Sequence, residues 1–70
     1  MITNKTVQQL AYVATNGGSL VVSAKNLTVE NMTHIANNLK DHAHLRICES
    51  DALTSENMAH IARNGNVIFE

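Results

Sequence analysis

The chain has 70 residues, a formal net charge of −1 and one cysteine, Cys48. A single cysteine excludes an intramolecular disulfide and a multi-cysteine metal site, and it favours a reducing, cytoplasmic location. The near-neutral charge and the presence of only two aromatic residues argue against direct nucleic-acid binding. No apolar run has the form of a signal peptide or the length of a membrane span, so we expect one domain, residues 1–70, with no membrane contact.

The chain contains an internal repeat. Residues 28–38 (TVENMTHIANN) return 26 positions later as residues 54–64 (TSENMAHIARN), with eight of eleven positions identical. A weaker copy, TVQQLAYVATN, occupies residues 6–16. Periods of this size are typical of stacked repeat proteins, in which each unit packs against its neighbours. The sequence therefore predicts three copies of one structural unit.

Each copy is predicted to form a helix. Its first residue is a threonine, whose hydroxyl can accept a hydrogen bond from a free backbone N–H of the first turn. Apolar residues follow at helical spacing, and each copy ends at an asparagine. Gly17 and Gly65 come directly after two of these asparagines and are predicted to be left-handed helix stops.

A short apolar run follows each helix, at residues 20–22, 45–48 and 67–69. These runs predict short strands, so the element order is αβαβαβ. Equivalent strands of a repeat point the same way, and helical connections favour right-handed crossovers. The predicted fold class is α/β, with three αβ repeats, a small parallel three-stranded sheet and the helices packed on one face.

This pattern resembles a short leucine-rich-repeat-like α/β solenoid over residues 6–70. The resemblance rests on the period, the unit type and the pairs Leu20-x-Val22 and Leu45-x-Ile47, whereas the asparagine ladder of that family is incomplete. It implies a solenoid architecture and assigns no functional residue.

The sheet face turned away from the helices is the first candidate surface. Because strand residues alternate sides, this face should carry Val21, Ser23, Arg46, Cys48, Ile68 and Glu70. It is either an open surface, which solenoids tolerate, or one covered by a protein partner or a second copy. The small size and the free C-terminal strand edge favour a homodimer.

Two further groups are candidates for partner contact. Glu49, Asp51 and Glu70 fall at the C-terminal ends of strands, where an acidic rim would meet a basic partner such as a nucleic-acid-binding protein. His42 and His44 lie in KDHAHL, where the second unit is four residues longer than the first. This loop is either solvated or a contact loop for the partner.

Neither a metal site nor a catalytic site is predicted. Tyr12, His34 and His60 share one repeat position, and two histidines lack the further ligands that zinc needs, so exposed polar residues are the favoured interpretation. Cys48 has no positioned base in the sequence pattern, which favours an inert thiol. We therefore expect no cofactor, no metal and no enzymatic activity.

The favoured function is a protein-binding module, a small inhibitor that occludes a surface on a larger protein or nucleoprotein assembly. In size and lack of catalytic motifs the chain is similar to small phage-encoded inhibitors such as anti-CRISPR proteins. The main alternative is a self-associating structural repeat protein whose open sheet face forms a homodimer. Weak metal binding by the histidines is a third possibility.

Overall fold

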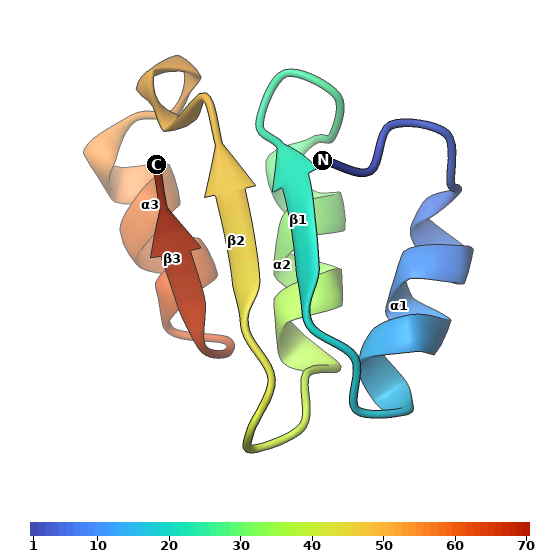
Figure 1. Cartoon of the computed structure of the whole chain (residues 1–70). Helices are drawn as coiled ribbons and strands as arrows, with labels where there is room; N and C mark the ends of the chain where they lie inside the picture. Colours follow the sequence, from blue (N-terminus) through green and yellow to red (C-terminus); the bar gives the residue numbers. More distant parts are fainter.

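The computed structural model describes residues 1–70 and contains three helices and three strands in alternation. The elements are α1 (Val7–Thr15), β1 (Leu20–Ser23), α2 (Val29–Asn37), β2 (Leu45–Cys48), α3 (Ser55–Ala62) and β3 (Val67–Phe69) (Figure 1). The strands form one parallel sheet in the order β1-β2-β3, which confirms the predicted α/β class. A short 3-10 helix, η1 (Ser50–Ala52), joins β2 to α3 and was not predicted from the sequence.

The helices begin where the threonines predict. Thr6, Thr28 and Thr54 each accept a hydrogen bond from the backbone N–H three residues later, at 3.2, 3.1 and 3.2 Å. At Thr6 the backbone N–H also donates to the side-chain Oε1 of Gln9, at 2.9 Å, which completes a capping box. These bonds satisfy N–H groups that have no partner within a helix.

The helices end on a repeated side-chain bond. The side-chain amides of Asn16, Asn38 and Asn64 each donate to the carbonyl four residues earlier, at 2.9, 2.8 and 2.8 Å. Carbonyls in the last turn of a helix lack intrahelical partners. The asparagine at this repeat position is therefore explained by local structure.

The two glycines that follow these asparagines serve different purposes. Gly17 has φ +94°, as predicted for a left-handed helix stop. Gly65 does not have positive φ, so that prediction is wrong there. A Cβ on Gly65 would overlap the backbone carbonyl of Ala36 in α2. Glycine is therefore needed at this position for the close approach of two repeat units.

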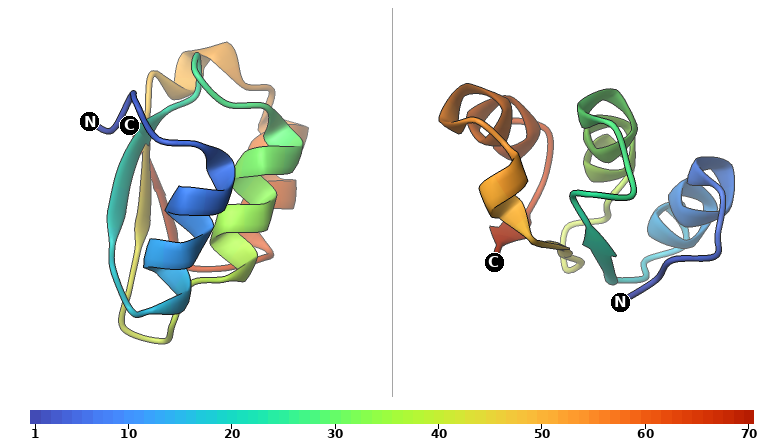
Figure 2. Two further views of the ribbon diagram at one scale, coloured as in Figure 1. Left: turned by 90° about the vertical axis from the view of Figure 1, so that its right-hand side faces the viewer. Right: turned by 90° about the horizontal axis from the view of Figure 1, so that it is seen from above.

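The core lies between the sheet and the row of helices. Both views in Figure 2 show α1, α2 and α3 on the same side of the sheet. Inward-facing residues of β1 and β2 are buried, as are the central residues of the helices: Leu20, Val22, Leu45, Ile47, Met32, Ile35 and Ile61. The opposite sheet face has no covering element. No helix has both the length and the apolar character needed to cross a membrane.

Candidate interaction surface

The open sheet face brings together residues from all three strands. The parallel register pairs Val21 with Arg46 and Arg46 with Ile68, so these three form one row across the sheet. Arg46 and Ile68 are exposed and Val21 is half-buried. Ile68 is one of only four large hydrophobic residues that are exposed in the chain. The row therefore combines apolar area with a cation.

A shallow hollow of about 250 Å³ lies on this row, at the start of β1 and β2. Its walls include Ser19, His44 and all three residues of the row. The backbone N–H of His44 donates to Ser19 Oγ at 3.1 Å, and the His44 carbonyl accepts from the Leu20 N–H at 3.0 Å. The volume is below that of most small-molecule pockets.

The histidine loop is held in place against the sheet. The side-chain amide of Asn66 donates to the Asp41 carbonyl at 3.2 Å, and Ala43 is buried. His42 and His44 are both exposed, but only His44 lines the hollow. The structure thus joins His44 to the open sheet face and leaves His42 outside it.

Ser23, predicted as a partner contact, is covered on this face in the folded chain. Its side chain is 1% exposed, although its strand position faces away from the helices. The Ser23 hydroxyl donates to the Glu49 carboxylate and accepts from the Lys25 N–H at 3.1 Å. Glu49 therefore covers Ser23. Cys48, paired with Ser23 across the sheet, is half-buried and is a free thiol.

The predicted acidic rim is largely neutralised. Glu49 forms an ion pair with Lys25 at 3.4 Å, and Glu70 forms one with Arg46 at 2.6 Å. Asp51, exposed on η1, is the one rim carboxylate without a salt bridge. Because the Glu70–Arg46 pair is about half exposed, it stabilises the fold little and is available for exchange with a partner.

Glu49 is a structural residue of the rim. It is the only non-glycine residue with positive φ, at +60°, a conformation that costs free energy for most side chains. The hydrogen bond from Ser23 lowers the pKa of the Glu49 carboxyl below its ordinary value of 4.5, and the charge of Lys25 lowers it further against the opposing effect of burial. The ionised carboxylate thus holds the turn after β2.

Acid is expected to destabilise the chain through Glu49. A carboxyl whose pKa is lowered by folding stabilises the native state above its unfolded pKa, and this contribution is lost as pH falls through the folded pKa. Thermal unfolding of the wild type should therefore move to lower temperature between about pH 5 and pH 3. In Glu49→Gln the decline over this window should be shallower, and Asp51→Asn is the matched control. Parallel acid profiles for the wild type and Glu49→Gln would contradict this assignment.

His34 and His60 lie exposed on α2 and α3, with Tyr12 at the same repeat position on α1. No group of three or more histidine, cysteine, aspartate or glutamate side chains is placed to hold a metal ion. The structure offers these histidines no additional protein ligand.

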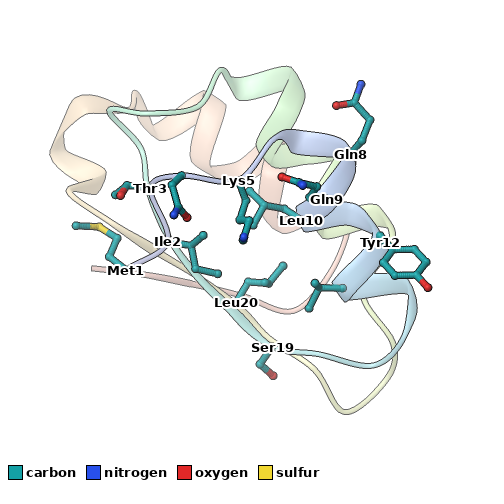
Figure 3. Close-up of a pocket in the computed structure, with 12 residues that line it drawn as sticks. Met1, Ile2, Thr3, Lys5, Gln8, Gln9, Leu10, Tyr12, Ser19 and Leu20 are labelled. Atoms are coloured by element: carbon teal, nitrogen blue, oxygen red, sulfur yellow. The ribbon is translucent and has the colours of Figure 1, made fainter.

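The largest cavity was not predicted from the sequence. It is a groove of about 880 Å³ between residues 1–5, α1 and the start of β1 (Figure 3). Ile2, Leu10 and Leu20 converge in it, Tyr12 and Val13 lie along α1, and none of the predicted contact residues lines it. The groove depends on residues 1–5 folding back, which no local pattern indicates.

One sequence signal could have drawn attention to the part of this groove that lies on α1. Tyr12 replaces the histidine of the other two copies, which places a large ring at an exposed helical position. Copies that differ at a solvent-facing position mark a surface that is specific to one unit.

The chain matches no known family model, no curated protein and no solved structure. Its function is therefore inferred from its own surfaces.

Proposed function

We propose that the chain is a non-enzymatic protein-binding module that covers a surface on a larger protein or nucleoprotein assembly. The observation that supports this proposal is the uncovered parallel sheet, with the row Val21, Arg46 and Ile68 on its open face. Parallel sheets are usually covered on both faces, because their crossover connections place helices there. A partner that buries this row supplies the missing layer.

The specific form we propose is a small cytoplasmic inhibitor, similar in size to phage-encoded anti-CRISPR proteins. The longest dimension of the chain is 29 Å, which suits occlusion of a site better than enclosure of a substrate. The hollow accepts one apolar side chain, and Arg46 and His44 beside it favour a neighbouring carboxylate on the partner. Asp51 at the far end of the sheet favours a basic group there.

Affinity capture with matched variants tests this proposal. Ile68→Arg and Arg46→Glu alter the centre of the open face, where the few residues that dominate binding energy cluster, so we expect each to weaken binding about tenfold or more. His34→Gln and Glu56→Gln alter the exposed helix side and are the controls. We expect one captured protein to lose affinity for the first pair and to keep it for the controls, while circular dichroism shows all four variants folded. Equal capture by all four would exclude the open sheet face as the binding site.

The alternative use of the same face is a homodimer, which the free edge of β3 favours. In that case Ile68→Arg shifts the purified protein from the mass of a dimer to that of a monomer in sedimentation, and no second protein is captured. Asp51→Lys tests the rim separately from the open sheet face. Reversal of this peripheral charge should mainly change the association rate with a charged partner.

A further inference from the structure

Helix α1 exposes a side whose counterparts on α2 and α3 are buried. Val13, Ile35 and Ile61 occupy one repeat position on α1, α2 and α3. Ile35 and Ile61 are 0% exposed, whereas Val13 is 43% exposed. α2 has α1 beside it and α3 has α2 beside it, while α1 has no neighbour on its outer side (Figure 2). The exposure of Val13 is therefore that of an incomplete repeat interface.

The last helix shows the complementary deficit. Ala14, Ala36 and Ala62 also share a repeat position, and the first two are buried. Ala62 is exposed, and Met58 is half-buried where its counterpart Met32 is fully buried. α3 has no following helix against it. The two ends of the row of helices thus carry the two opposite halves of the contact that joins the units inside the chain.

Exposed apolar residues are concentrated at the first of these ends. Three of the four large exposed hydrophobic residues of the chain, Met1, Tyr12 and Val13, line the groove beside α1. Tyr12 is 71% exposed. We call the surface formed by Lys5, Gln9 and Val13 the α1 end, and the surface formed by Met58, Ala59 and Ala62 the α3 end.

Charge distinguishes the two ends. Residues 1–29 contain Lys5 and Lys25 and no acidic residue. Because Lys25 is paired with Glu49, Lys5 is the cation of this part of the chain without a salt bridge. Residues 46–70 contain four carboxylates and two arginines, a net charge of −2. Lys5 is the only charged side chain that lines the groove. Opposite charges attract when the α1 end meets the α3 end, whereas two α1 ends repel each other.

From this geometry we infer that the α1 end binds the α3 end of a second copy of this chain, so that the row of helices continues from one molecule to the next. The contact runs between helices, because the carbonyl of Val21 on the outer edge of β1 already accepts the Ile2 N–H at 2.8 Å. It is a head-to-tail contact, in which two different surfaces meet. It leaves the open sheet face free for the proposed partner.

Complementation between two blocked variants tests this inference. Val13→Arg blocks the α1 end and Ala62→Arg blocks the α3 end, and arginine is tolerated at both exposed helical positions. In sedimentation over a concentration series, we expect the wild type to associate and each variant to associate about tenfold or more weakly. An equimolar mixture of the two should form a one-to-one dimer and nothing larger, because only one pair of intact ends remains.

Three results would overturn the inference. A wild type that stays monomeric up to its solubility limit would exclude the contact. An Ala62→Arg variant that dimerises as the wild type does would indicate a symmetric contact between two α1 ends. Loss of association in Ile68→Arg alone would place self-association on the open sheet face.

Lys5→Glu is the second variant at the α1 end and keeps the test decisive if Val13→Arg fails to fold. Lys5 precedes the helix and is exposed, so its substitution does not disturb the core. Charge reversal should weaken association, and added salt should weaken the wild type more than it weakens Lys5→Glu. Equal salt dependence in the two proteins would contradict the electrostatic part of the contact.

Discussion

Replacing Ile35 by alanine is expected to bring the chain close to unfolding. Ile35 is fully buried in α2, at the centre of the core cluster. Removing three carbons from such a site costs about 2–5 kcal/mol, because the cavity collapses only in part. Domains of this size have total stabilities on the order of 4–10 kcal/mol. Urea denaturation followed by circular dichroism measures the loss, and Ile35→Val, at about 0.5–1.5 kcal/mol, serves if the alanine variant does not fold.

The matched control for Ile35 lies one repeat earlier. Val13→Ala removes apolar carbons from the same repeat position, but Val13 is 43% exposed. Its loss in the monomer should stay below about 1 kcal/mol, because exposed apolar carbons gain little on folding. Ile61→Ala, at the third copy, should resemble Ile35→Ala. Similar losses at Val13 and Ile35 would mean that α1 is covered on its outer side in the folded monomer.

Substitution of Gly65 is expected to have the second largest effect. An alanine Cβ there would overlap the Ala36 carbonyl, which belongs to the backbone of α2 and cannot rotate away. The two units would have to move apart, which costs about 1–3 kcal/mol for overpacking of this kind. Thermal unfolding of Gly65→Ala against the wild type measures this cost.

Gly17 provides the contrast, because its constraint is φ and not space. A Cβ on Gly17 meets nothing within 4 Å, but φ is +94°. Asparagine tolerates positive φ better than alanine does. Gly17→Asn should therefore destabilise less than Gly17→Ala, while Gly65→Asn should destabilise at least as much as Gly65→Ala. The same order of stabilities at both glycines would show that one mechanism governs both.

Residues that act within one turn of chain were predictable. Thr6, Thr28 and Thr54 cap helices by bonds to backbone groups three residues away, and strand residues alternate sides wherever the backbone is extended. Because the unit occurs three times, a prediction made for one copy applied to the equivalent residues of the other two. The parallel sheet then followed from equivalent strands joined by helices.

Residues that act across units were not predictable. Ser23 was expected on the open face, but the carboxylate of Glu49, 26 residues later, covers it. The acidic rim is predicted to contact a basic partner, but Lys25 and Arg46 of this chain pair with two of its carboxylates. Gly65 was expected to stop a helix, but its position is set by the backbone of α2. In each case the second group comes from another unit, and its distance depends on how the units stack.

The amino-acid sequence alone predicts the repeat, the helix caps, the order of elements and the two faces of the sheet, because these depend on contacts within one turn or on the two-residue period of a strand. Which surfaces are exposed depends on how the three units pack against one another. The groove beside α1 requires residues 1–5 to fold back onto β1, and the exposure of Val13 and Ala62 requires the row of helices to end at α1 and α3. Identical positions in the copies differ in burial because burial depends on the neighbouring unit, which the residue itself does not encode.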